Sequence, residues 1–129
     1  MIERHLEIFE DFIENKNLEV EMKSTMRVDI QANPLLFDMV ISNLISNAIK
    51  HNQSGGYVKI ELSQKGLMIN NSGHPPIQPT ENLFNRFEKS SENADSSGLG
   101  LAIVKEICDY HNLEIEYKFE EDHAIAITF

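Results

Sequence analysis

The sequence has little cysteine, few basic residues and no long apolar run, and each shortage excludes a class of protein. Cys108 is the single cysteine, so no internal disulfide can form, which is typical of a reducing compartment. The 11 Lys and Arg against 21 Asp and Glu give a formal net charge of −10, which argues against a nucleic-acid binder because such proteins present a basic face. No apolar stretch approaches the length of a membrane span. We expect a cytoplasmic domain without direct contact to nucleic acid or membrane.

The composition indicates one folded domain over residues 1–129. With 41% hydrophobic residues, a chain of 129 residues can bury a core. Helical spacing and strand-like alternation of apolar residues mark its elements. The predicted helices are 3–16, 35–52 and 101–111, and the predicted strands are 18–23, 27–31, 57–63, 67–70, 113–118 and 124–129. Three amphipathic helices could cover one face of a mixed sheet, which predicts a two-layer α/β sandwich with wet outer faces.

The histidines show no pattern of a site. None of the five is spaced as a metal ligand, so we expect no zinc centre and expect each histidine to stand alone. His5 could be considered as a phospho-accepting histidine, but no proline or basic residue follows it in the way such a site usually shows. A position facing solvent on the first helix is therefore expected.

Two asparagines on the middle helix indicate a ligand site. Asn43 and Asn47 are four residues apart, so they share one side of the helix with Lys50, beside an apolar stripe. A neighbouring loop could satisfy such amides, but the pair followed by Lys50 and His51 favours a ligand. An amide oxygen suits Mg²⁺, and a lysine adds positive charge toward phosphates.

Two glycine motifs add weaker signals. Asn71-Ser72-Gly73 follows a strand, where glycine lets the backbone approach a flat ring and asparagine can bond a base edge. A plain turn is the better explanation of this motif when it is taken alone. Gly98-Leu99-Gly100 opens the last helix, whose free amides and dipole can hold an anion, although a flexible hinge is the alternative.

Together these stretches resemble the catalytic and ATP-binding domain of bacterial sensor histidine kinases, within the superfamily that includes type II topoisomerases and Hsp-class chaperones. NLISNAIKHN is similar to the asparagine box, INNSGHPP takes the place of the first glycine box, LFNRFEKSS is similar to the phenylalanine box, and SSGLGLAIVKEI is similar to the second glycine box. The boxes occur in the family's order over nearly the whole chain. The resemblance implies the α+β Bergerat fold, a sandwich with a mixed sheet of five or six strands, three helices on one face and a flexible ATP lid at about 76–97.

The resemblance also implies a role for each site residue. Asn47 would coordinate Mg²⁺, Asn43 would support it, and Lys50 would contact the phosphates. Asn71 would bond the adenine amino group, with Gly73 giving the ring room. The other implied binding residues are His51 near the nucleotide, Phe84 and Phe87 as lid anchors, Arg86 or Lys89 toward the γ-phosphate, and the amides of Gly98, Leu99, Gly100 and Leu101 around the phosphates.

The boxes depart from the family's pattern in two places. The first glycine box normally reads Asp-x-Gly-x-Gly, but here Asn71 lacks the charge and Pro75 replaces the second glycine and stiffens the chain. In the second glycine box, Ser97 stands directly before Gly98, so one upstream glycine is lacking. Adenine binding is therefore still expected, and whether these departures weaken it stays open.

Asn43 distinguishes branches of the superfamily. In the chaperone and topoisomerase ATPases that the chain resembles, a glutamate four residues before the Mg²⁺ asparagine activates water. An amide cannot act as a general base near neutral pH, so Asn43 predicts poor hydrolysis. Such a protein would keep its ATP for phosphoryl transfer, which depends on positioning and charge neutralisation.

The implied function is that of a protein histidine kinase in two-component signal transduction. The domain would bind Mg²⁺-ATP and pass the γ-phosphoryl group to a histidine on its own dimerisation domain, and from there to a response regulator. We expect that domain and a membrane-bound sensor part to lie outside this sequence, so the fragment should bind ATP without autophosphorylating. Two alternatives stay open: an anti-sigma-type serine kinase, and a degenerate interaction domain without nucleotide affinity.

Overall fold

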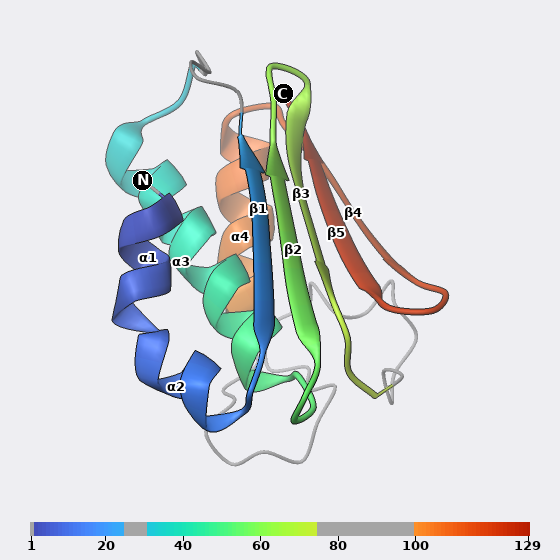
Figure 1. The fold of residues 1–129 in the computed structure, drawn as a ribbon. Coiled ribbons are helices and arrows are strands. Elements are labelled where there is room, and N and C mark those ends of the chain that lie inside the picture. The colour runs from blue at the N-terminus through green and yellow to red at the C-terminus, as the bar shows by residue number, and fades with distance from the viewer. Residues whose placement is uncertain (1, 25–30, 75–99) are drawn as a thin grey trace.

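The computed structural model describes residues 2–24, 31–74 and 100–129 as two layers, with helices on one face of a sheet and the other face open (Figure 1). This arrangement confirms the expected α+β sandwich. The elements in chain order are α1 (Ile2–Ile8), α2 (Glu10–Asn15), β1 (Glu19–Ser24), α3 (Pro34–Lys50), β2 (Tyr57–Leu62), β3 (Gly66–Asn71), α4 (Gly100–Tyr110), β4 (Glu114–Phe119) and β5 (His123–Thr128).

The first predicted helix, 3–16, forms as two helices that meet at Phe9. The hydrogen bonds from Phe9 N to His5 O and from Ile13 N to Phe9 O continue across the junction, so the segment turns without losing its backbone bonding. The short strand predicted at 27–31 falls almost wholly outside the described residues, as does the expected lid at 76–97.

The sheet is mixed, with strand order β1-β2-β3-β5-β4. β1 pairs with β2 in parallel, and the other neighbours pair antiparallel. The parallel pair needs a crossover, and α3 supplies it across the helical face. Since β2 and β3 form a hairpin, β3 returns to the end of the sheet where α3 finishes. Asn71 at the end of β3 therefore lies beside Val58 of β2 and His123 of β5.

Helix α3 is the centre of the core. Asn33 caps it, accepting from the amides of Leu35 at 2.9 Å and Leu36 at 3.2 Å, and Pro34 occupies the first turn. The predicted apolar stripe is buried, consisting of Phe37, Ile41, Leu44, Ile45 and Ala48. Helix α4 packs beside it, and its buried Cys108 has a pKa raised by burial to about 11, which makes the thiol unreactive.

The prediction for His5 is wrong. His5 is buried, and its Nε2 lies 2.9 Å from Oδ1 of Asp38 on α3. The same carboxylate accepts a bond from Arg4 at 2.7 Å. His5 lies on the helix face that also carries Ile2 and Phe9, so α1 turns it toward α3, and the carboxylate compensates part of its polarity.

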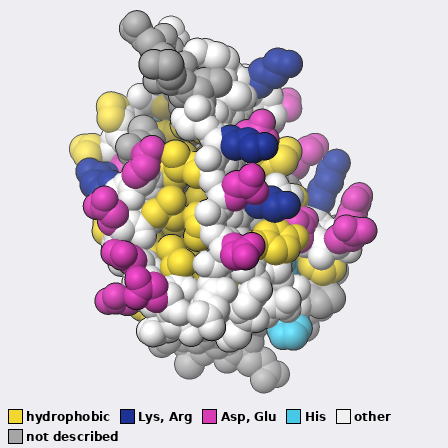
Figure 2. All heavy atoms as spheres, in the orientation of Figure 1, with side chains coloured by type: hydrophobic (Ala, Val, Ile, Leu, Met, Phe, Trp, Pro, Cys, Tyr) yellow, Lys and Arg dark blue, Asp and Glu magenta, His cyan; other side chains and the backbone are white. Residues whose placement is uncertain are grey.

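Acidic side chains are prominent on the surface (Figure 2), as expected from the net charge of −10. Figure 2 shows charged side chains of both signs over the strands and mostly acidic ones over the helical side, with a strip of hydrophobic side chains between them. Within the described ranges, no helix combines the length and apolar character that crossing a membrane requires.

Candidate functional site

The predicted site residues that the structure describes gather at one end of the molecule. The last turn of α3, the end of β3, the start of α4 and the start of β5 all lie at the lower end of Figure 1. The crossover and the hairpin bring these segments together, although they are distant in the sequence. The sheet topology therefore makes one site out of the asparagine and glycine motifs.

Asn43 connects α3 with the beginning of α4. Its Nδ2 donates to the carbonyl of Met39 at 2.8 Å, which leaves the amide oxygen for other contacts. A Cβ at Gly100 would lie 3.2 Å from that oxygen. The asparagine and second glycine motifs thus lie side by side, and the absent side chain at Gly100 leaves space beside the Asn43 amide.

Asn47 and Lys50 are available for a ligand. Asn47 is half-buried one turn after Asn43, and in the described part of the chain no hydrogen bond uses its side-chain amide. Lys50 is exposed at the end of the helix. A half-buried amide is stabilised by a polar partner, and its oxygen is the kind of ligand that Mg²⁺ prefers. These residues fit a metal bound together with phosphate oxygens.

The end of α3 is held by a lysine that sequence reasoning missed. Lys16 Nζ donates to three carbonyl oxygens, those of Ile49 at 3.1 Å, Lys50 at 3.0 Å and Asn52 at 3.3 Å. A cation at this position also interacts favourably with the negative end of the helix dipole. Lys16 therefore fixes the backbone that carries Lys50 and His51.

Asn52 and Ser72 form a second support that the sequence did not reveal. Asn52 Nδ2 donates to the carbonyls of Ala48 at 3.1 Å and Tyr57 at 2.9 Å, while its Oδ1 accepts from Ser72 Oγ at 2.6 Å and from the Gln53 amide at 2.8 Å. All four bonding positions of the buried amide are used. A Cβ at Gly56 would lie 2.1 Å from Ser72 Oγ, so only glycine fits there.

The first glycine motif abuts the end of α3. Asn71 is buried, and its Nδ2 donates to the Ser72 carbonyl at 2.8 Å. Gly73 has a φ of 154°, and a Cβ there would lie 2.8 Å from the carbonyl oxygen of His51. A side chain at this position would press against α3, so a glycine is required where the strand leaves the sheet.

His51 is neutral in this setting. Burial lowers its pKa from the ordinary value of 6.5, and the positive charges of Lys16 and Lys50 lower it further, as would a charge on His123. Gly73 lies between the His51 carbonyl oxygen and the His123 ring, because a Cβ there would be 2.8 Å from the former and 3.2 Å from the latter.

Several predicted residues cannot be placed. The lid residues and the first part of the second glycine box lie outside the described residues, namely Phe84, Arg86, Phe87, Lys89, Gly98 and Leu99. Gly100 and Leu101 form the first turn of α4, and Leu101 packs against the core. Amides in a first helical turn have no partner within the helix and remain available to an anion.

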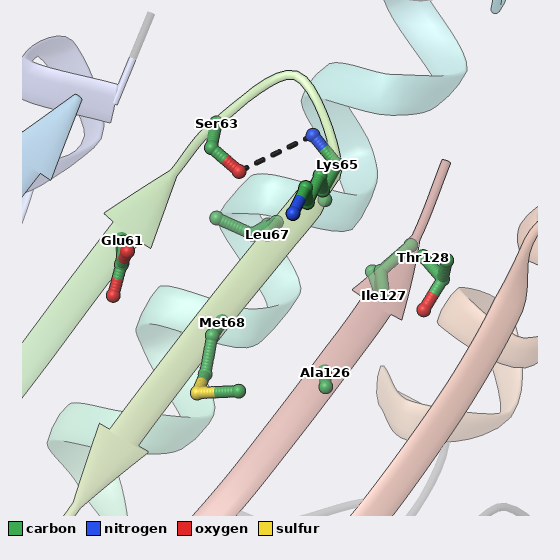
Figure 3. A pocket seen from close by; sticks show the side chains of 9 residues that line it. Glu61, Ser63, Lys65, Leu67, Met68, Ala126, Ile127 and Thr128 are labelled. Atoms are coloured by element: carbon green, nitrogen blue, oxygen red, sulfur yellow. Dashed lines mark hydrogen bonds between the residues drawn. The ribbon is translucent and has the colours of Figure 1, made fainter. Parts of the chain in front are cut away.

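A separate hollow lies on the open face of the sheet, at the β2–β3 turn. Figure 3 shows Ser63, Lys65, Met68 and Thr128 around it, with the Ser63 hydroxyl accepting from the Lys65 amide. None of the predicted site residues is among the described residues that line it. This hollow is distinct from the site at the end of α3.

Known proteins match this chain over most of its length. The family model for histidine kinase-, DNA gyrase B-, and HSP90-like ATPases matches residues 32–129. The heme sensor protein HssS of Staphylococcus saprophyticus is 33% identical over 124 residues, which cover 92% of this chain and 27% of the relative. The chain thus spans about a quarter of the length of that curated relative.

Solved structures of histidine kinases share the fold. The nucleotide-free catalytic domain of histidine kinase ThkA superposes with a TM-score of 0.84 at 23% identity, covering 99% of this chain and 88% of that one. The mycobacterial sensor histidine kinase MprB gives a TM-score of 0.80 at 27% identity, covering 99% and 90%. ThkA in complex with the response regulator protein TrrA gives 0.74 at 25% identity, covering 98% and 38%.

Proposed function

Because the chain belongs to the family of histidine kinase-, DNA gyrase B- and HSP90-like ATPases, and is a catalytic and ATP-binding domain of the histidine kinase type, we propose that it binds Mg²⁺-ATP and delivers the γ-phosphoryl group to a histidine on a dimerisation domain. The observation that carries the proposal is the convergence of three motifs. Asn43 lies beside Gly100, where a Cβ would be 3.2 Å from its Oδ1, and Gly73 lies beside the end of α3, where a Cβ would be 2.8 Å from the His51 carbonyl oxygen.

The phosphate end of the nucleotide would lie between α3 and α4. Asn47 would offer its amide oxygen to Mg²⁺, and Asn43 would orient the same face from one turn earlier. Bound Mg²⁺ supplies charge neutralisation on the phosphate oxygens. Lys50 adds a mobile positive charge, and the first amides of α4 add donors at the positive end of the helix dipole. This arrangement supplies the positioning and charge stabilisation that phosphoryl transfer requires.

The adenine end would lie at Asn71 and Gly73. Asn71 is buried, and its amide oxygen can accept from the adenine amino group. Its Nδ2 already bonds the Ser72 carbonyl, which leaves the oxygen for the base. Gly73 keeps the adjoining backbone free of a side chain.

Asn43 also bears on the fate of the phosphoryl group. It occupies the position from which a carboxylate would activate water, and its amide cannot take a proton. The domain would therefore hydrolyse ATP slowly and hold it until a histidine attacks. By likeness to ThkA, whose structure was determined with a response regulator, the final acceptor would be such a regulator. By likeness to the heme sensor protein HssS, the whole protein would be a sensor. This domain would then lie in the cytoplasm.

A binding titration tests the nucleotide site. Wild-type protein is titrated with ATP, with and without Mg²⁺, by calorimetry. We expect micromolar-range affinity that requires the metal and is lost in Asn47→Ala, because the variant lacks the amide oxygen. Asn15→Ala, which changes an exposed asparagine on α2, serves as the matched control and should bind like the wild type. No binding by the wild type up to millimolar ATP would favour the degenerate interaction domain instead.

A further inference from the structure

Both ring nitrogens of His123 are engaged at the start of β5. Nε2 lies 2.7 Å from the carbonyl oxygen of His74, and Nδ1 lies against the hydroxyl of Tyr117 on β4. A carbonyl can only accept, so Nε2 carries the proton and donates it to His74. In the neutral ring Nδ1 then accepts from the Tyr117 hydroxyl. One imidazole thus ties β4 and β5 to the segment that leaves β3.

The His123 ring is also held by residues of its own β4–β5 hairpin. Phe119 packs against it with ring centroids 4.7 Å apart. On the open face of the sheet, Asp122 accepts from the Tyr57 hydroxyl at 2.6 Å and from Asn70 Nδ2 at 3.4 Å. The turn before β5 is therefore anchored to β2 and β3, and His123 can act as a firm support.

The ring lies directly beside the proposed adenine site. Asn71 and His123 are register partners, so their side chains emerge on the same face of the sheet. A Cβ at Gly73 would lie 3.2 Å from Cδ2 and Nε2 of the ring and 2.8 Å from the His51 carbonyl oxygen. The backbone after Asn71 is thus confined between the His123 ring and the end of α3.

We propose that His123 is a positioning residue for the nucleotide base: its ring holds the Gly73–His74 backbone so that Asn71 presents its amide oxygen to the adenine amino group. The inference rests on the proposed function, and it adds a residue that lies outside all four boxes of the family resemblance. It also assigns part of the base selectivity to the β4–β5 hairpin.

The protonation states agree with this geometry. Burial lowers the pKa of His123 despite the opposing effects of the His74 carbonyl and of Asp122, so the ring is neutral near pH 7. Burial raises the pKa of Tyr117, so its hydroxyl stays protonated and can donate. The neutral ring with its proton on Nε2 is therefore the dominant form of the bridge.

The test compares three ligands that share a triphosphate: ATP, inosine triphosphate, which lacks the adenine amino group, and inorganic tripolyphosphate. In the wild type we expect ATP to bind more tightly than inosine triphosphate. In His123→Phe, which cannot donate to His74, we expect ATP affinity to fall about tenfold, as for loss of a well-placed hydrogen bond, with tripolyphosphate binding unchanged. His123→Gln, which keeps a donor near the Nε2 position, should retain ATP affinity within about twofold.

Matched variants separate positioning from stability. Ile127→Val weakens the core from the same strand at the opposite end and should leave the ratio of ATP to inosine triphosphate affinity unchanged. If His123→Phe does not fold, Tyr117→Phe becomes the decisive variant, because it removes the hydroxyl that bonds His123 Nδ1. It should lower the ratio of ATP to inosine triphosphate affinity by a smaller factor than expected for His123→Phe. An unchanged ratio in the decisive variant, or an equal loss for tripolyphosphate, overturns the inference. A wild type that binds no ATP instead refutes the proposed function, and the inference fails with it.

Discussion

Asn43, Asn47 and Gly100 show how single residues divide the work at the phosphate end of the site. The Nδ2 of Asn43 donates a hydrogen bond to the helix backbone, while the Asn47 amide has no hydrogen-bond partner among the described residues. Gly100 contributes only the absence of a side chain beside the Asn43 oxygen. The pair of asparagines is thus unequal, with Asn47 suited to a ligand and Asn43 suited to shaping its surroundings.

Gly100→Ala tests whether the space beside Asn43 serves the nucleotide. The added Cβ would lie 3.2 Å from Asn43 Oδ1, so the amide must shift by a few tenths of an ångström. Alanine is the better helix former by roughly 0.5–1 kcal/mol, so the melting temperature should stay level or rise. We expect weaker ATP binding, measured by calorimetry beside thermal melts. Unchanged ATP affinity would show that the gap has no role in binding.

At the scale of elements, the site depends on how α3 is held at both ends. Lys16 bonds the last carbonyls of the helix, and Asn33 caps its first turn. Near the first turn of α3, the Asp38 carboxylate forms hydrogen bonds with His5 and Arg4 of α1. These contacts keep the helix in place against the sheet, so Asn47 and Lys50 keep their positions relative to Asn71.

The contact between α1 and α3 predicts a pH effect on stability. The hydrogen bond from His5, and then the charges of His5 and Arg4, hold the pKa of Asp38 below its ordinary value of 3.8. The carboxylate therefore contributes stability that is complete above about pH 4 and is lost as the pH falls through the lower folded-state pKa.

Thermal melts between pH 5 and pH 3 measure this contribution. The wild-type melting temperature should fall more steeply with acid than that of Asp38→Asn, which cannot titrate at this position. The isosteric amide keeps the shape of the side chain, so the difference in slope isolates the charge. Parallel slopes for the two proteins would contradict the assigned pKa.

For the whole molecule, the fold could be predicted from local patterns. The apolar stripe of α3 has helical period, and alternation in 57–63 and 67–70 indicates a hairpin, because both patterns are set by neighbours in the chain. The asparagine and glycine boxes also predicted which residues share one site, since Gly100 lies beside Asn43 and Gly73 lies beside the end of α3. The roles of those residues toward a nucleotide remain predictions.

The supporting contacts could not be predicted because their partners are distant in the sequence. His5 lies 33 residues from Asp38, and a lone histidine on an amphipathic helix carries no sign of that partner. His123 and His74 are 49 residues apart and meet only because β5 pairs with β3. For Asn52 and Ser72, Gly56 was the one weak signal, since a glycine can mark a close approach of backbone and side chain, but it did not name the partners.

The central claim, phosphoryl transfer to histidine, is tested most directly by mixing the chain with a histidine-bearing dimerisation domain of a sensor kinase, γ-labelled ATP and Mg²⁺. We predict label on the dimerisation domain that is lost in acid and retained in base, as for phosphohistidine, and no label with Asn47→Ala. Acid-stable label, as for phosphoserine, or release of phosphate without any labelled protein would contradict the account.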